Sequence, residues 1–273
     1  MEFWKMNGAG NDFIVVDNRT LWASPERLGR IAAVLCRRRF SVGADGLMAV
    51  EPAEQGGDFK MRFFNADGSV GEMCGNGARC ICRYGYELGL AGETQRVETT
   101  AGLVTGLRLG PECYRVRLNP PTVLEDCRET ALGPGGYVEL GNPGVPHSLF
   151  PLPGLGARTL EELRPIGFRL RHDGAYPKGA NANLYDFLGP DHLVIRTFER
   201  GVEDFTLACG TGTGSLVALL TCRGEVSGRG VRVENLGGTL TVDAVCDRGR
   251  ITELLLTGPA QVSYRGRVEE LPD

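Results

Sequence analysis

The chain has few of the side chains that usually hold metals or carbonyl cofactors. Its 273 residues include three histidines, at spacings that match no zinc or iron site, and three lysines, none in a setting typical of a Schiff-base lysine. Cys80-Ile81-Cys82 also lacks the second cysteine pair that a metal site of this type needs. The sequence therefore predicts no metal and no organic cofactor.

Positive charge and long apolar runs are also scarce. The formal net charge is −4, so no excess of basic residues is available for nucleic acid or an anionic membrane. No segment reaches the roughly 18 apolar residues of a membrane span, and the residues after Met1 do not form an export signal. We expect a soluble cytoplasmic protein whose partner is a small molecule.

Cysteine, in contrast, occurs nine times. An odd number in a long chain without an export signal favours free thiols over a disulfide framework. Seven of the nine are expected to be packing residues: Cys36, Cys80, Cys82, Cys113, Cys127, Cys222 and Cys246.

The remaining two cysteines, Cys74 and Cys209, each open a glycine-rich run that leads into a predicted helix. Unpaired N–H groups and the helix dipole favour an anion at such a position, so each thiol could ionise near neutral pH. A lone cysteine before glycine is usually a small buried side chain. Two at matching places, half the chain apart, favour instead two thiols that face one substrate.

The same spacing recurs elsewhere and indicates an internal duplication. Four pairs of segments are separated by nearly the same distance along the chain as the two cysteines: Arg96–Thr105 with Arg232–Thr241, Gly43–Asp45 with Gly179–Asn181, Asn65 with Arg200, and Asn11 with His147. Because the matches keep their order, we predict two copies of one α/β unit of roughly 130 residues. The junction is expected at Asn119-Pro120-Pro121.

Hydrophobic periodicity predicts a helix over Pro25–Arg38 with one apolar face, further helices over 77–88, 160–164 and 212–220, and a loop at Gly133–Gly136. The predicted strands cover residues 2–6, 13–17, 47–51, 59–65, 97–99, 103–109, 114–118, 137–140, 148–152, 184–187, 193–198, 239–245, 251–257 and 261–264.

Three motif blocks together resemble diaminopimelate epimerase. They are Lys5–Phe13, Phe64–Ser69 running into Met73–Cys80, and Glu199–Gly201 running into Ala208–Gly212. The blocks span most of the chain in the family's order. The resemblance implies an α/β (α+β) fold of two pseudo-symmetric domains, each a mixed, mainly antiparallel sheet wrapped around a central helix. The domains would be 1–118 plus 261–273, and 119–260.

The resemblance also implies the cofactor-independent conversion of LL- to meso-diaminopimelate, in lysine and peptidoglycan precursor synthesis. Inverting an α-carbon requires a base on one face and an acid on the other, and Cys74 and Cys209 would take these roles. The family's binding residues carry over as Asn11 and Glu199 at the reacting amino group, Asn65, Asn181 and Arg200 at the distal end, and N–H groups of Gly75, Asn76, Gly210 and Thr211 at the α-carboxylate. His147 would support the thiols, and the protein would be a monomer or a homodimer.

The chain departs from the family at three places that concern distal recognition. Val145 replaces the asparagine of a Gly-Asn-Pro-His motif, and Gly46 stands where some members carry glutamine. Asn183 follows Asn181 so closely that either could be the distal ligand.

Three other functions stay open on the residues alone. The first is a related racemase of another α-amino acid. The second is a non-catalytic two-domain anion-binding module, in which both cysteines only cap helices. The third is a thiol redox protein with a Cys74–Cys209 disulfide.

Overall fold

Two units of the chain follow the same path of strands and helices. The computed structural model describes residues 1–71 and 75–271. Unit 1 comprises Met1–Val116 and Gly258–Asp273, and unit 2 comprises Arg117–Thr257.

The elements of unit 1 are β1 (Glu2–Gly8), β2 (Asn11–Asp17), α1 (Asn18–Leu21), α2 (Pro25–Leu35), β3 (Gly46–Glu51), β4 (Phe59–Asn65), α3 (Gly75–Glu87), β5 (Thr94–Thr99), β6 (Gly102–Arg108), β7 (Cys113–Arg117) and the final strand β17 (Gln261–Arg267). Those of unit 2 are β8 (Pro121–Thr130), β9 (Gly133–Leu140), β10 (Val145–Pro151), the 3₁₀ turn η1 (Leu155–Ala157), α4 (Leu160–Arg171), β11 (Asn181–Gly189), β12 (His192–Glu199), β13 (Asp204–Phe205), α5 (Gly210–Arg223), β14 (Val231–Asn235), β15 (Gly238–Asp247) and β16 (Arg250–Pro259).

Strand pairing confirms the predicted duplication. In unit 1, β1–β2 is antiparallel, β2–β3 parallel, β3–β4 antiparallel, β4–β5 parallel and β5–β6 antiparallel. In unit 2, β9–β10, β10–β11, β11–β12, β12–β14 and β14–β15 repeat this series. Even the register is kept, since Val97 faces Val104 in unit 1 and the matching residues Val233 and Leu240 face each other in unit 2.

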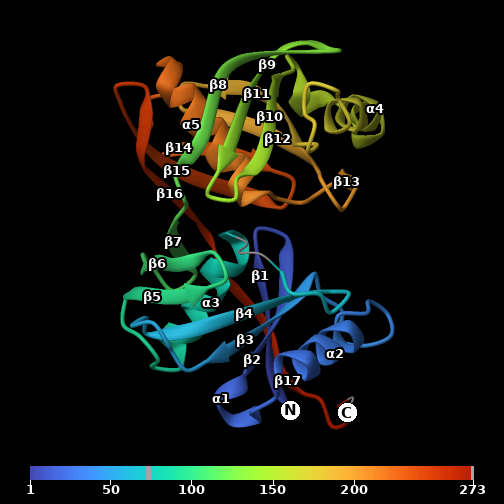
Figure 1. Cartoon of the computed structure of the whole chain (residues 1–273), viewed down its shortest axis with the longest axis vertical. Helices are drawn as coiled ribbons and strands as arrows, with labels where there is room; N and C mark the ends of the chain where they lie inside the picture. Colours follow the sequence, from blue (N-terminus) through green and yellow to red (C-terminus); the bar gives the residue numbers. More distant parts are fainter. Residues whose placement is uncertain (72–74, 272–273) are drawn as a thin grey trace. The chain divides into compact units, whose positions relative to one another are not determined.

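Each unit adds one more antiparallel strand at the same edge. β17 pairs with β1 in unit 1, and β8 pairs with β9 in unit 2. Both chain ends therefore lie in unit 1 (Figure 1), where Val268 and Met1 exchange N–H···O bonds of 2.8 and 2.7 Å.

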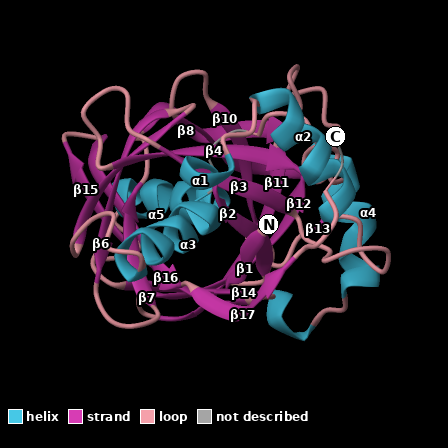
Figure 2. Cartoon of the chain, turned by 90° about the horizontal axis from the view of Figure 1, so that it is seen from below, coloured by secondary structure: helices cyan, strands magenta, loops and turns pink. Residues whose placement is uncertain are grey.

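The sheet of each unit curls around one helix and carries another on its outer side. α3 contacts β1, β2 and β6, whereas α5 contacts β8, β9, β10 and β15. Figure 2 shows α3 and α5 ringed by strands, with α2 and α4 outside them. The α/β fold with a central helix in each repeat is confirmed.

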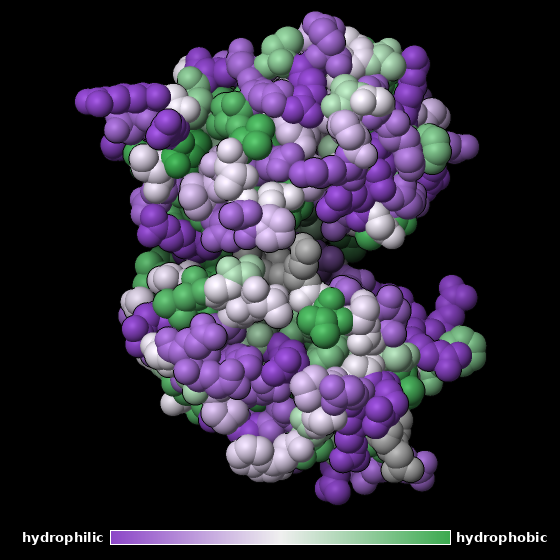
Figure 3. Space-filling model, in the orientation of Figure 1, coloured by the Kyte–Doolittle hydropathy of each residue, from purple (hydrophilic) through white to green (hydrophobic). Residues whose placement is uncertain are grey.

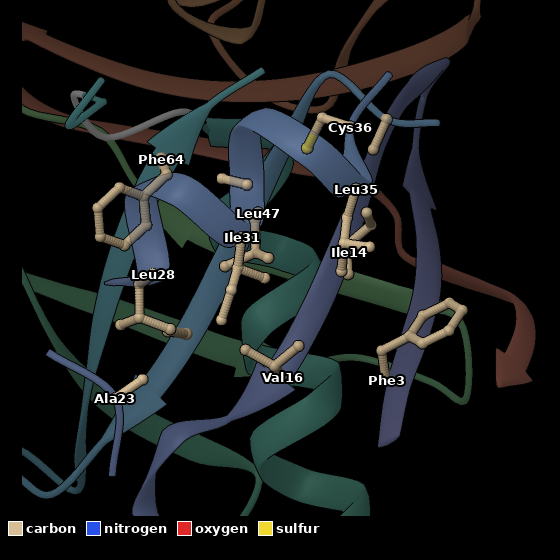
Figure 4. Close-up of a cluster of buried hydrophobic side chains, with 13 residues drawn as sticks. Phe3, Ile14, Val16, Ala23, Leu28, Ile31, Leu35, Cys36, Leu47 and Phe64 are labelled. Atoms are coloured by element: carbon tan, nitrogen blue, oxygen red, sulfur yellow. The ribbon is translucent and has the colours of Figure 1, made fainter. Parts of the chain in front are cut away.

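Helix α2 illustrates how the sequence builds the outer layer. Ser24 caps it by accepting the N–H of Arg27, and Pro25 occupies its first turn. The predicted apolar face is buried and packs on Ile14, Leu47 and Phe64 in one hydrophobic cluster (Figure 4). The helix ends at Leu35 rather than Arg38, because Leu35 O accepts the N–H of Gly43 and the chain turns back.

The predicted loop at Gly133–Gly136 is wrong. These residues form the first half of β9 and pair with both β8 and β10. Their glycines have a packing role, because a Cβ on Gly136 would lie 2.2 Å from a methyl carbon of Leu219 in α5. The prediction also missed α1, β8, β13 and β14, which are short, lie at an edge or lack a clear alternation.

The expectation that all packing cysteines are free thiols is wrong for two of them. Cys222, near the end of α5, forms a disulfide with Cys246 on β15. The residues lie 24 positions apart in sequence but face each other where α5 packs on β15. Sequence spacing carries no signal for this pairing, because it depends on how the helix lies on the sheet.

Polar side chains dominate the exposed surface. In the view of Figure 3, hydrophilic side chains cover most of the face and hydrophobic ones gather in small patches. Within the part of the chain that the structure describes, no helix is long and apolar enough to span a membrane.

The disulfide gives a first prediction. Replacing Cys222 by Ser should lower the free energy of unfolding by about 3 kcal/mol, because the bridge closes a short loop in the unfolded chain. Urea unfolding without reductant measures this loss. The loss should vanish when both proteins are unfolded in dithiothreitol.

The exposed Cys127 provides the matched control, since Cys127→Ser removes a thiol that forms no disulfide. Thiol titration in denaturant should also find two more thiols in the wild type after reduction than before. Equal counts would contradict the bridge.

Candidate active site

In unit 2, Cys209 is the N-cap of the central helix α5. Its backbone is extended, and its Sγ accepts the N–H of Gly212 at 3.4 Å and lies 3.5 Å from the hydroxyl of Thr211. The side chain is 7% exposed. A helix N-terminus and its N–H donors favour the thiolate form of a sulfur held there.

The start of α5 fits against β11 only because glycines leave room. A Cβ on Gly212 would lie 2.3 Å from the amide oxygen of Asn183. Gly210 is likewise buried and begins the helix, and Thr211 is half-buried beside the sulfur. The glycine run after Cys209 thus places the N–H of Gly212 and the hydroxyl of Thr211 beside one thiol.

Asn183 is fully buried, and every polar atom of its side chain is used inside unit 2. Its amide nitrogen donates to the carbonyls of Ser148 and Asn181 at 2.9 and 3.0 Å, and its oxygen accepts the hydroxyl of Thr197 at 2.8 Å. The same nitrogen lies 3.2 Å from Nδ1 of His147. Asn183 therefore ties β10, β11 and β12 together behind the start of α5.

His147, on β10, is fully buried beside Asn183. Because the amide nitrogen of Asn183 can only donate, Nδ1 is the acceptor and the neutral ring carries its proton on Nε2. Nε2 makes no hydrogen bond to any described residue. Burial, reinforced by the positive charge of Arg200, lowers the pKa of His147 to about 3, so the ring is neutral at pH 7.

Asn181, Glu199 and Arg200 gather at the ends of two adjacent strands. The oxygen of the Asn181 side chain accepts the N–H of Arg200 at 2.8 Å. Glu199, the last residue of β12, accepts the hydroxyl of Thr206 at 2.9 Å. The guanidinium of Arg200 is exposed and donates to the carbonyl of Lys178. Unit 2 thus brings its predicted site residues to one end of β11 and β12.

In unit 1, Asn11 and Asn76 are joined by a hydrogen bond from the amide nitrogen of Asn76 to the oxygen of Asn11. Asn11 begins β2, and Asn76 follows the buried Gly75 in the first turn of α3. The oxygen of Asn76 in turn accepts a 2.8 Å bond from Arg79, which is also fully buried. These predicted residues are therefore in contact.

Asn65 closes β4 and holds the turn that follows it. Its side chain donates to the hydroxyl of Ser69 at 2.9 Å, while its N–H and carbonyl bond to Ser69 and Gly68. Gly68 packs so closely on α2 that a Cβ there would lie 2.5 Å from the carbonyl of Gly29. Cys74, at the start of α3 in the sequence, lies outside the described residues.

Sequence reasoning missed the supporting residues. Asp45 contacts Asn11, Arg79 contacts Asn76, and Thr206 contacts Glu199. Asp45 left a signal, because the Gly43–Asp45 match with Gly179–Asn181 places it opposite a predicted ligand, and Arg79 lies within the Met73–Cys80 motif block.

A family model described as diaminopimelate epimerase matches residues 3–107 and 140–263. The chain belongs to the diaminopimelate epimerase family. The prediction of an isomerase, an epimerase, is thereby confirmed.

Curated relatives match along nearly the whole chain. The chain is 38% identical to the diaminopimelate epimerase of Aquifex aeolicus, over 99% of this chain and 98% of that protein. It is also 38% identical to the diaminopimelate epimerase of Chlorobaculum tepidum, over 96% and 99%.

Solved structures share the fold at low sequence identity. A PhzF-family phenazine biosynthesis protein of Bacillus anthracis matches with a TM-score of 0.73 and 17% identity, over 98% of each chain. A probable proline racemase of Agrobacterium radiobacter K84 matches with a TM-score of 0.71 and 16% identity, over 98% of this chain and 92% of that one.

The buried histidine gives a second prediction. The ordinary pKa of a histidine is near 6.5, whereas that of His147 is about 3 when folded. Between these values the unfolded chain binds one proton more, so stability must fall as the pH drops from about 6.5 toward 3. His147→Asn keeps an acceptor near Nδ1 but cannot titrate.

Urea unfolding of both proteins between pH about 4 and about 6.5 tests this. The wild type should lose up to about 1.4 kcal/mol more per pH unit than His147→Asn. Parallel pH profiles would mean that the histidine is not held neutral.

Proposed function

We propose that this protein converts LL- to meso-diaminopimelate by two-base epimerisation, with Cys74 and Cys209 as the bases and no cofactor. One thiolate takes the α-proton from one face of the stereocentre, and the thiol of the other cysteine gives a proton to the opposite face. The thiolate and thiol have then exchanged roles. Product release and proton exchange with solvent restore the starting state.

The arrangement at Cys209 carries this proposal. Its sulfur is held at the N-terminus of α5 by an N–H and next to a hydroxyl, which is the environment that a thiolate base needs. In the sequence repeat, Cys74 takes the matching position before α3. A single capping cysteine would require no such counterpart.

The α-proton is a very weak acid, so the developing carbanion needs support. We propose that N–H groups of Gly75, Asn76, Gly210 and Thr211, at the starts of α3 and α5, bind the α-carboxylate. Oriented helix N-termini stabilise the negative charge that develops there without a ring cofactor.

The remaining site residues divide between the two ends of the substrate. Asn11 and Glu199 would hold the reacting amino group, and Asn65, Asn181 and Arg200 the distal amino acid group. The exposed guanidinium of Arg200 suits a bidentate bond to the distal carboxylate. His147, as a neutral ring, would support the thiols.

Between the two neighbouring asparagines, we assign the distal contact to Asn181. Asn183 is fully buried and its amide is used by four groups of unit 2. Asn181 is 5% exposed and its oxygen already orients Arg200. A ligand at Asn183 would have to displace these internal bonds.

We further propose that units 1 and 2 are the two epimerase domains of the family, and that the reaction serves lysine and peptidoglycan precursor synthesis in the cytoplasm.

One substitution favours a second candidate, the racemisation of another α-amino acid. Val145, at the start of β10, replaces a polar side chain expected for distal recognition. With fewer distal contacts, the site would discriminate less strongly against simpler amino acids.

Incorporation of deuterium from heavy water tests the function and is our third prediction. The wild type should exchange the α-proton of diaminopimelate and invert it, whereas Cys209→Ser should lower kcat/KM for inversion at least about 10³-fold, because serine is a poor base at neutral pH. Cys74→Ser should lower kcat/KM for inversion by a similar factor. Mass spectrometry and chiral chromatography measure exchange and inversion.

Cys113→Ser, at a half-buried cysteine of β7, is the matched control and should retain full activity. Full activity of Cys209→Ser would refute the two-thiol mechanism. Exchange into a different amino acid, with none into diaminopimelate, would favour the second candidate instead.

A further inference from the structure

A continuous chain of hydrogen bonds runs through unit 1 from Arg79 to Asp45. Arg79 donates to the oxygen of Asn76 at 2.8 Å, the nitrogen of Asn76 donates to the oxygen of Asn11, and the nitrogen of Asn11 donates to a carboxylate oxygen of Asp45 at 3.2 Å. All three bonds point in the same direction.

The two residues at the ends of this series of hydrogen bonds fix its direction. A guanidinium has only donors and a carboxylate has only acceptors. Arg79 therefore forces the oxygen of Asn76 toward itself, and Asp45 forces the nitrogen of Asn11 toward itself. Without such partners, an asparagine amide could flip and exchange its oxygen with its nitrogen, with little change in shape.

Asp45 is itself held in place by two further groups. The oxygen that accepts from Asn11 also accepts the backbone N–H of Asp12 at 3.1 Å, and its other oxygen accepts from Arg38 at 2.8 Å. Arg38 also pairs with Asp12, which Lys5 contacts at 2.6 Å. Burial alone would raise the pKa of Asp12, but the bonds from Arg38 and Lys5 lower it, so Asp12 stays ionised at pH 7.

We infer that Asp45 is a positioning residue, which sets the orientation of the Asn11 amide so that its oxygen, and not its nitrogen, is offered to the amino group of the substrate. The inference rests on the proposed function, in which Asn11 holds the reacting amino group. An ammonium group has only donors, so a flipped Asn11 would repel it.

The duplication supports this role. Asp45 matches Asn181 of unit 2 in the sequence repeat, and the oxygen of Asn181 likewise orients a predicted ligand, Arg200, through its N–H. The same position on the two parallel strand pairs thus holds a site residue in each unit. In unit 1 the residue at this position is a carboxylate. Only a carboxylate can accept hydrogen bonds from all three donors around it, which are the amide nitrogen of Asn11, the N–H of Asp12 and the guanidinium of Arg38.

Asp45→Asn tests the inference, because it keeps the shape but loses one acceptor. Either orientation of the new amide turns its NH₂ group toward a donor, Arg38 or Asn11. Equilibrium binding of diaminopimelate is measured by calorimetry in the Cys209→Ser background, where turnover does not interfere. Asp45→Asn should weaken binding about tenfold or more.

The decisive comparison is a double-mutant cycle with Asn11→Ala. Since Asp45 acts through Asn11, Asp45→Asn should change binding less than about twofold once Asn11 is absent. If Asp45 had only a structural role, Asp45→Asn would weaken binding by the same factor with and without Asn11, and that result would overturn the inference. Undiminished binding by Asp45→Asn alone would overturn it as well.

Asp58→Asn is the matched control. Asp58 also accepts a backbone N–H, from Arg96 at 2.6 Å, and pairs with the Arg96 side chain, but it does not contact Asn11. In the Cys209→Ser background, Asp58→Asn should bind diaminopimelate with an affinity within about twofold of that of the parent, Cys209→Ser alone. Failure of the parent to bind diaminopimelate, with Asp45 intact, would count against the proposed function and so remove the basis of the inference.

Discussion

The central helix of each unit must begin directly against a strand of the sheet that surrounds it. In unit 2 the contact is between Gly212 and Asn183, and in unit 1 it is between Gly77, which matches Gly212 in the sequence repeat, and Met48 of β3. No side chain larger than hydrogen fits at Gly212, because a Cβ would lie 2.3 Å from the Asn183 oxygen. This approach places the helix N-terminus at the ends of the strands, where the candidate site residues lie.

The two versions of this contact differ in polarity. Met48 is an apolar partner, whereas Asn183 is an amide that binds His147, Thr197 and the backbone of β10 and β11. Unit 2 therefore carries a buried polar network behind its thiol. Within it, the donor-only amide nitrogen of Asn183 faces Nδ1, which restricts His147 to the tautomer with its proton on Nε2.

Much of this was predictable from the sequence. The nearly constant spacing between matching segments indicated the duplication, the apolar face of α2 followed from its periodicity, and the glycine run after Cys209 indicated a helix start with exposed N–H groups. These features are local or repeat along the chain. The family resemblance added the candidate ligands Asn11, Asn65 and Arg200.

The features that escaped prediction depend on packing between distant segments. The Cys222–Cys246 bridge requires a helix to lie on β15, and Gly133–Gly136 form the start of β9, where Gly136 leaves room for Leu219 of α5. Likewise, Asp45 gains its role only where β2 and β3 run in parallel side by side. Composition and turn propensity cannot register such contacts.

The return of β17 to unit 1 has a consequence for synthesis on the ribosome. Unit 2 is continuous and emerges whole, but β1 lacks one of its two neighbours, β17, until all of unit 2 has been translated. An unpaired strand edge invites association with other chains. The nascent protein thus carries one open sheet edge while the whole of unit 2 is synthesised, and a chain truncated before β17 could not close it.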